Sequence, residues 1–261
     1  MDLELDDKVV LITGGSDGLG RAAAARLVAE GARVAICARD EQRLERTAAE
    51  LEAIGAGGEV LAMPADVRDP AALERFLGAA VERWGRVDGL VNNAGETSAM
   101  RFESLTDDDL DRDLELKVYA AVRLIRLALP ALRRSPGPSV VNVLSIGAKA
   151  PTPRSTPTTI SRAAGLALTK VLASELGPEG VRVNAICVGL VESGQWVRLA
   201  AQRGLPIADL EVALVEDAGV PLGRVGRGDE FGDLAAYLLS ARSSYITGTA
   251  INLDGGTSPV V

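Results

Sequence analysis

A glycine-rich segment near the start of the chain has the residue types and spacing of a phosphate-binding turn. The segment is TGGSDGLGRAAA (residues 13–24), where Gly14, Gly18 and Gly20 follow an apolar run and open an Ala-rich one. Glycines at this spacing let the backbone turn tightly and approach a pyrophosphate, whose charge is favoured at the amino end of the following helix. The segment therefore predicts a dinucleotide site.

A lysine in an apolar stripe is a second chemically notable residue. The pattern over residues 107–134 predicts a long helix, opened by a capping box at Thr106 and Asp109, and Lys117 falls on its apolar face. An isolated charge there is costly, so Lys117 is expected to reach an active-site cleft or to titrate toward neutrality. A lysine near neutrality is a competent acid or base. In the alternative interpretation its stem packs and its amine extends to water or to a partner chain.

The residue types that are absent exclude several classes of protein. The chain has no histidine, which rules out a Ser-His-Asp hydrolase and removes the commonest metal ligand. The two cysteines, Cys37 and Cys187, lie in apolar runs and are expected to be buried free thiols in a reducing cytoplasm, without a disulfide or a metal.

Charge and hydropathy point to a cytoplasmic protein that binds a small molecule. The 261 residues carry a net charge of −8 and no basic block, which argues against nucleic acid and anionic membranes as partners. The acidic start MDLELDD lacks the apolar core of a signal peptide, and no apolar run approaches the ~18 residues of a membrane span.

Apolar strand-like runs alternate with amphipathic helix-like runs along the whole chain. This alternation predicts one α/β domain over residues 1–261, a Rossmann-type, doubly wound parallel sheet of about seven strands with helices on both faces. Residues 188–228 contain no strand pattern and are a candidate substrate lid. The expected strands are 8–13, 33–38, 59–64, 87–92, 139–145, 181–187 and 249–255, and the expected helices are 19–30, 41–54, 70–84, 107–134 and 157–176.

Several motifs together resemble the short-chain dehydrogenase/reductase family over nearly the whole chain. They are the glycine segment, DV (66–67), NNAG (92–95), GVRVNAICVGLVES (180–193), PLGRVG (221–226) and LDGG (253–256). The resemblance implies a nicotinamide dinucleotide along the strand ends. It also implies a homo-tetramer or dimer whose contacts come from the long helix and the last strand.

The resemblance assigns the remaining cofactor residues. Asp66 and Val67 would meet the adenine. The segment 190–193 would reach the nicotinamide carboxamide, although Val188 stands where the family usually has proline. The full implied set also includes residues of the glycine turn, of the NNAG motif and of the segment 190–193: Ser16, Leu19, Asn93, Ala94, Gly95, Val191 and Ser193.

The choice between NADP and NAD depends on two residues of opposite charge. At the end of the second strand, where an acidic residue would bind the ribose hydroxyls of NAD, the chain has Ala38 and then Arg39. A guanidinium can bind a 2′-phosphate bidentately, so Arg39 favours NADP. Asp17 in the glycine turn would repel a phosphate and leaves NAD as the less favoured alternative.

The catalytic set departs from the family pattern. The family uses Ser, Tyr, a Lys four residues later, and an Asn in the long helix; the matching positions here are Ser145, Thr158, Arg162 and Lys117. Thr158 is much less acidic than a phenol, whose pKa is about 10, and Arg162 keeps its proton. We hypothesise that Lys117 replaces the tyrosine as proton donor, that Ser145 and Thr158 orient the substrate oxygen, and that Arg162 holds the cofactor.

The sequence therefore predicts an NADP-dependent oxidoreductase with an altered acid/base set. Its substrate would be a small carbonyl, alcohol or activated alkene. Two alternatives stay open, which are a non-catalytic dinucleotide-binding sensor or partner subunit, and a lyase or isomerase on the same fold. Other polar residues near the expected cleft, more typical of solvated positions, are Glu96, Lys149, Arg154 and Ser155.

Overall fold

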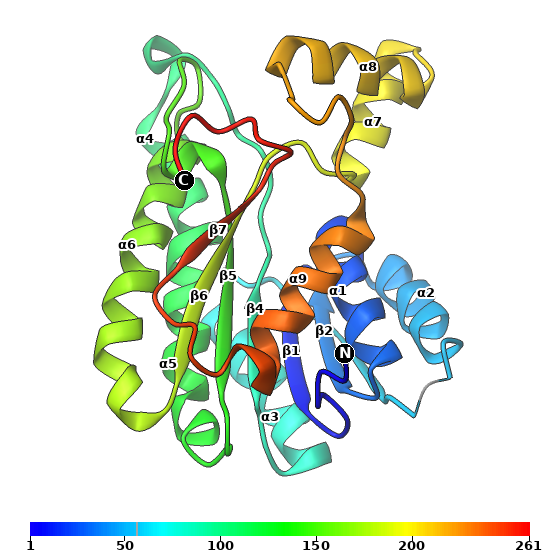
Figure 1. The fold of residues 1–261 in the computed structure, drawn as a ribbon, viewed down its shortest axis with the longest axis vertical. Coiled ribbons are helices and arrows are strands. Elements are labelled where there is room, and N and C mark those ends of the chain that lie inside the picture. The colour runs from blue at the N-terminus through cyan, green and yellow to red at the C-terminus, as the bar shows by residue number, and fades with distance from the viewer. Residues whose placement is uncertain (56) are drawn as a thin grey trace.

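The centre of the molecule is a parallel sheet of seven strands in the order β3-β2-β1-β4-β5-β6-β7. The computed structural model describes residues 1–55 and 57–261. Figure 1 shows the sheet edge-on between helical layers. The strands are β1 (Val9–Thr13), β2 (Arg33–Ala38), β3 (Val60–Pro64), β4 (Gly89–Asn92), β5 (Ser139–Ser145), β6 (Arg182–Val188) and β7 (Ala250–Leu253).

Helices pack on both faces of this sheet. One apolar core lies between the sheet and α1 (Gly18–Ala29), α2 (Glu41–Glu52) and α9 (Gly228–Leu239). The other lies between the sheet and α3 (Pro70–Trp84), α5 (Ala120–Leu132) and α6 (Thr158–Leu176). Strands covered on both sides bury nearly every side chain, and this explains their continuous apolar runs. The expected Rossmann-type fold and its seven strands are confirmed, with strand ends shifted by up to two residues.

The long helix expected over residues 107–134 is interrupted. It consists of α4 (Asp107–Leu114), a π-helical turn (Glu115–Tyr119) and α5. The expected capping box is present, since Thr106 and Asp109 bond each other's backbone N–H groups. A π-helical turn adds a residue to the helical repeat and changes the direction of the side chains that follow. Lys117 lies within this turn and is buried.

Helix α6 packs small residues against the sheet and leaves larger apolar ones exposed. Ile160 and Val171 are 42% and 52% exposed, whereas Ser161, Gly165 and Thr169 face inward. Small residues are required there because the helix lies close to the sheet. A Cβ on Gly165 would stand 2.6 Å from Leu144 Cδ2.

The region expected as a lid carries two helices beyond the carboxyl ends of the strands. They are α7 (Gly194–Arg203) and α8 (Ile207–Ala218), which stand above the sheet in Figure 1 before the chain returns through α9. Within the described part of the chain, none of the helices has the length and apolar character needed to cross a membrane. Because the strand order reverses between β1 and β4, the crevice for a ligand opens at the end of the sheet that α7 overhangs.

Candidate active site

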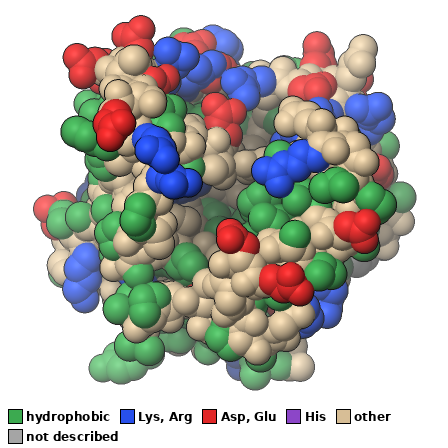
Figure 2. Space-filling view, turned by 90° about the horizontal axis from the view of Figure 1, so that it is seen from above, with side chains coloured by type: hydrophobic (Ala, Val, Ile, Leu, Met, Phe, Trp, Pro, Cys, Tyr) green, Lys and Arg blue, Asp and Glu red, His purple; other side chains and the backbone are tan. Residues whose placement is uncertain are grey.

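A cleft of about 750 Å³ lies at the carboxyl ends of the strands. Figure 2 looks down on this end of the molecule and shows a hollow with both basic and acidic side chains around its rim. The volume is within the usual range for small-molecule and cofactor sites. Most of the expected site residues line it: Gly14, Ser16, Gly18, Leu19, Arg39, Asp66, Val67, Asn93, Ala94, Gly95, Ser145, Thr158, Arg162, Val191 and Ser193.

The glycine turn packs closely against the start of α1 and against Asn93, which leaves no space for a side chain at Gly20. A Cβ on Gly20 would stand 2.2 Å from the Gly14 carbonyl oxygen and 2.5 Å from Asn93 Nδ2. Gly14 has a φ of +67°, which favours glycine. Asn93 Nδ2 donates to the carbonyl oxygens of Thr13 and Gly14, at 3.0 Å each, and this fixes the turn against the strand end. The turn thus presents the amino end of α1 to the cleft, as a pyrophosphate requires.

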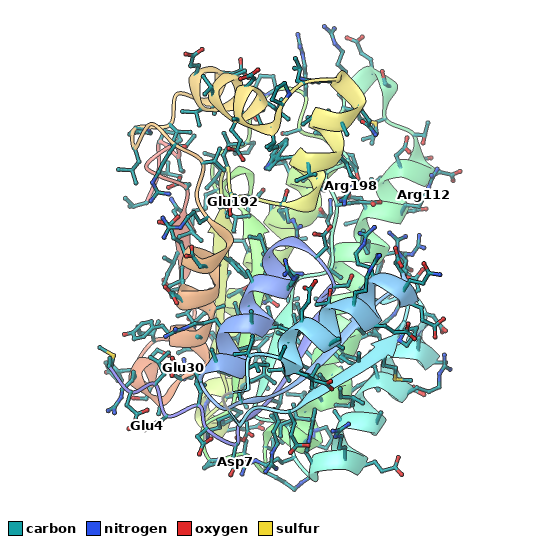
Figure 3. All side chains as sticks on the ribbon, turned by 90° about the vertical axis from the view of Figure 1, so that its right-hand side faces the viewer. Glu4, Asp7, Glu30, Arg112, Glu192 and Arg198 are labelled. Carbon is teal, nitrogen blue, oxygen red and sulfur yellow. The ribbon has the colours of Figure 1, made fainter. Side chains whose placement is uncertain are left out.

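Arginines surround the end of the cleft where the adenosine is expected. Arg39 is exposed and lines the cleft, and among residues 1–55 and 57–261 it has no ion-pair partner within 4.0 Å. Asp17, which argued against NADP, is paired with Arg43 (3.4 Å) and with Arg198 of α7 (3.0 Å). Its charge is therefore compensated. Figure 3 shows Arg198 at the end of the molecule opposite Glu4 and Asp7.

The neighbouring Asp66 carboxylate is also engaged. Arg68 binds both of its oxygens, at 3.0 to 3.1 Å from Nε and 2.6 Å from Nη2. The guanidinium holds the pKa of Asp66 below its usual range. Asp66 thus presents an ionised, fixed carboxylate at the wall of the cleft, beside Val67.

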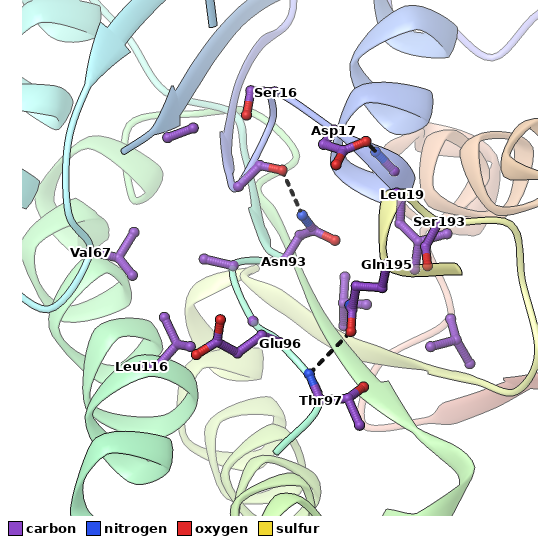
Figure 4. Close-up of a pocket in the computed structure, with 18 of the residues that line it drawn as sticks. Ser16, Asp17, Leu19, Val67, Asn93, Glu96, Thr97, Leu116, Ser193 and Gln195 are labelled. Carbon is purple, nitrogen blue, oxygen red and sulfur yellow. Dashed lines mark hydrogen bonds between the residues drawn. The ribbon is translucent and has the colours of Figure 1, made fainter. Parts of the chain in front are cut away.

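One edge of the cleft is formed by the start of α7. Gln195 Oε1 accepts a hydrogen bond from the Thr97 N–H (3.3 Å), which links this helix to the segment after β4 (Figure 4). Trp196 also lines the cleft, and its indole N–H donates to the Val191 carbonyl oxygen (3.0 Å). Ser193 lies beside Gln195, opposite Val67 and Leu116 in Figure 4.

Three of the four expected catalytic residues meet at the other end of the cleft. Ser145 ends β5, and Thr158 and Arg162 project from the first turns of α6. Arg162 Nη1 donates to the Val143 carbonyl oxygen (2.7 Å), and burial lowers the pKa of Arg162 to about 10. Its Nε is buried and has no hydrogen-bond partner among the residues that the structure describes. Arg162 thus places a fixed positive charge in the wall beside Gly95.

Lys117 lies behind Thr158, outside the wall of the cleft. Its side chain is 1% exposed, and Nζ donates to Thr158 Oγ1 (3.2 Å) and to the carboxylate of Asp113. Burial, together with the positive charge of Arg162, lowers the pKa of Lys117 to about 8. Lys117 was expected either to reach the cleft or to titrate toward neutrality, and it does not line the cleft. We hypothesised that Lys117 donates a proton directly to the substrate, but the Thr158 hydroxyl lies between the Lys117 ammonium and the cleft.

Thr158 Oγ1 also accepts the Ser98 N–H, at 3.0 Å. A hydroxyl has one proton and two acceptor positions, and two donors fill the acceptor positions here. Within the described residues, no protein acceptor is bonded to the remaining proton. The Thr158 O–H is therefore available to a ligand in the cleft.

Sequence reasoning missed the partners of this group, namely Asp113, Ser98 and Ser161. Asp113 alone had a readable signal, because residues four apart on a helix are neighbours and Asp113 precedes Lys117 by four. Of the secondary candidates, Glu96 lines the cleft. Lys149, Arg154 and Ser155 do not; Lys149 Nζ instead donates to the Ala250 carbonyl oxygen (2.6 Å).

Comparison with known proteins agrees with this architecture. A family model described as enoyl-(acyl carrier protein) reductase matches residues 14–258. The oxidoreductase UcpA of Escherichia coli O157:H7 is 36% identical over 98% of this chain and 96% of its own. The chain thus belongs to the short-chain dehydrogenase/reductase family of oxidoreductases.

Two solved structures are similar over almost their whole length. One is an NADPH-bound short-chain oxidoreductase of Pseudomonas aeruginosa PAO1, described as containing an atypical catalytic centre; it is 35% identical, covers 98% of this chain and 100% of its own, and has a TM-score of 0.92. The other is L-sorbose reductase of Gluconobacter frateurii in complex with NADPH and L-sorbose, 30% identical with both chains fully covered and a TM-score of 0.94.

Proposed function

We propose that this protein is an NADPH-dependent reductase of a small carbonyl compound or activated alkene. In this proposal Thr158 donates a proton to the substrate, and Lys117 then reprotonates Thr158. The observation that carries the proposal is the Thr158 hydroxyl, which accepts from Lys117 Nζ and from the Ser98 N–H and keeps its own proton for the cleft.

The preference for NADP is supported by the dinucleotide end of the cleft. Asn93 holds the glycine turn against the strand end, and Gly14, Ser16 and Gly18 line the cleft at the amino end of α1, so the residues fit a pyrophosphate. Arg39 would bind the 2′-phosphate, and Asp17 is no obstacle because Arg43 and Arg198 compensate its charge. Similar oxidoreductases have been solved with NADPH. When bound, NADPH supplies the hydride.

Each residue of the chemical end then has a separate task. Ser145 donates a hydrogen bond to the substrate oxygen from the end of β5. Arg162 binds the nicotinamide ribose and stabilises negative charge near the reacting centre. Thr158 transfers its proton as Lys117 passes one to Thr158 Oγ1, so the hydroxyl never carries a full negative charge. The pKa of Lys117, about 8, suits an acid working near neutral pH.

We further propose that residues 1–261 form one domain, in which residues 188–228 act as a substrate lid, and that the protein is cytoplasmic.

We also propose that the chain forms a homo-dimer or tetramer. Exposed apolar side chains on the long helix and on α6, namely Tyr119, Ile160 and Val171, support an interface on that side. Light scattering that gave the mass of a monomer would contradict the oligomer.

The test of the reductase function is transfer of deuterium from each of the two C4-deuterated NADPH diastereomers to a panel of aldehydes, ketones and enones, followed by mass spectrometry. We expect label on carbon from one diastereomer only. Tight NADPH binding with no transfer to any substrate class would contradict the reductase and favour the non-catalytic dinucleotide-binding protein.

A further inference from the structure

A buried carboxylate that no part of the reaction described above uses lies next to Lys117. Asp113 projects from the last turn of α4, and its side chain is 1% exposed. One of its oxygens pairs with Lys117 Nζ, and the other accepts the Ser161 hydroxyl at 2.5 Å. Both oxygens therefore have donors, and the carboxylate is held between two helices, α4 and α6.

The π-helical turn explains how one lysine contacts both of these elements. Lys117 is the middle residue of Glu115–Tyr119, between α4 and α5. From this position Nζ reaches back one turn to Asp113 and across to Thr158 at the start of α6. π-Helical turns often occur at functional sites because they re-aim side chains. Here the turn places an ammonium between a carboxylate and a hydroxyl.

The charges that face Lys117 oppose one another. Burial and the guanidinium of Arg162 favour the neutral amine, whereas Asp113 and the more distant Glu96 favour the ammonium. These three residues come from α6, α4 and the segment after β4. Of them only Asp113 contacts Nζ, so it is the group that most directly opposes the loss of the proton. Without a carboxylate partner, a lysine buried this deeply would have a pKa well below its usual value.

We propose that Asp113 is a positioning residue for the reaction: it keeps the Lys117 ammonium charged and directs one of its N–H bonds at Thr158, while Ser161 holds the carboxylate in place. The inference rests on the proposed function for its consequence in catalysis. The arrangement of Asp113, Lys117 and Ser161 can be tested without it.

The test is an Asp113→Asn variant with two readouts. The chain has four lysines, so selective 13Cε-lysine labelling gives few enough NMR signals to follow, and Lys117→Met identifies that of Lys117. We expect the pKa of Lys117 to fall from about 8 by about one unit or more in Asp113→Asn, because an opposite charge is lost. An unchanged pKa would overturn the proposal.

The second readout is the pH dependence of deuteride transfer. Reduction requires the protonated lysine, so the wild-type rate should decline as pH rises through about 8. In Asp113→Asn this decline should move to lower pH with KM for NADPH unchanged. A uniform loss of rate with no movement of the profile, together with an unchanged NMR titration, would mean a merely structural role and would overturn the proposal.

Controls separate this inference from the proposed function. Asp111→Asn removes an exposed carboxylate from the same helix and should leave both readouts unchanged. If circular dichroism shows that Asp113→Asn does not fold, Ser161→Ala is used in its place. We expect the pKa of Lys117 to fall in that variant by a smaller amount, and an unchanged pKa would contradict the proposal. A shifted NMR titration with no deuteride transfer in any variant would keep the role of Asp113 and reject the reductase.

Discussion

The two ends of the cleft differ in whether the backbone or the side chains would contact the ligands. At the dinucleotide end the backbone dominates: Gly14 and Gly20 let the turn pack closely on itself and on Asn93, and the amino end of α1 faces the cleft. At the chemical end side chains dominate: Lys117 donates to Thr158, and Thr158 and Arg162 line the cleft. Backbone geometry tolerates almost no substitution, whereas a chain of hydrogen bonds can be rebuilt from different donors. The proposed dinucleotide site thus depends on local backbone geometry, and the proposed acid/base set depends on contacts between residues distant in the chain.

The largest expected effect tests the backbone side of this comparison. Gly20→Ala places a Cβ 2.2 Å from the Gly14 carbonyl oxygen, so the turn must move. We expect NADPH affinity to fall by more than about 100-fold, since a displaced turn loses several charge-assisted hydrogen bonds. Calorimetric titration measures it.

Gly78→Ala is the matched control for that variant, because a Cβ there meets nothing within 4 Å. It should bind NADPH like the wild type. Unchanged affinity in Gly20→Ala would mean that the glycine turn does not hold the cofactor.

The next effect tests the side-chain end. Lys117→Met should lower the rate of deuteride transfer by about 10²- to 10⁴-fold, the usual worth of general acid catalysis. Its NADPH affinity should stay within about threefold of the wild type, because Lys117 lies outside the wall of the cleft. Stopped-flow single turnovers separate the two quantities.

Lys170→Met, at an exposed position of α6, is the control and should leave the rate unchanged. Thr158→Ser, which keeps the hydroxyl, should retain most of the activity. A Lys117→Met enzyme that turned over within threefold of the wild type would remove lysine from the proton path.

A smaller effect separates NADP from NAD within the dinucleotide end. Arg39→Ala should weaken NADPH binding by about tenfold or more, the worth of hydrogen bonds to a charged phosphate, and leave NADH binding nearly unchanged. Equal losses for the two cofactors would show that Arg39 does not contact the 2′-phosphate. Binding isotherms for both nucleotides provide the measurement.

The smallest effect concerns the contact between α7 and the glycine turn. Arg198 and Asp17 are 53% and 38% exposed, and exposed ion pairs contribute about 0 to 1 kcal/mol. Arg198→Ala should therefore change NADPH affinity by less than about fivefold, and high salt should reduce the difference further. A larger change would show that α7 contributes to the dinucleotide site directly.

Local patterns in the sequence predicted most of the fold. Strands such as β1 and β2 were recognisable because a strand covered on both faces is mostly apolar. The inward face of α6 could not be recognised in this way, since its nearness to the sheet selects Ser161, Gly165 and Thr169 over larger apolar residues. That nearness is a property of the packing and leaves no periodic apolar signal.

The sequence by itself determined the dinucleotide end, because tight turns and helix starts depend on residues that are adjacent in the chain. It also identified Lys117 as out of place on an apolar stripe. Only the tertiary structure decided what surrounds that lysine. Asp113, Thr158 and Ser98 come from α4, α6 and the segment after β4, and they meet because these elements pack together around a π-helical turn. A buried charge or hydroxyl needs a hydrogen-bond partner. The partners of Lys117 and Thr158 therefore determine the direction in which a proton can be transferred.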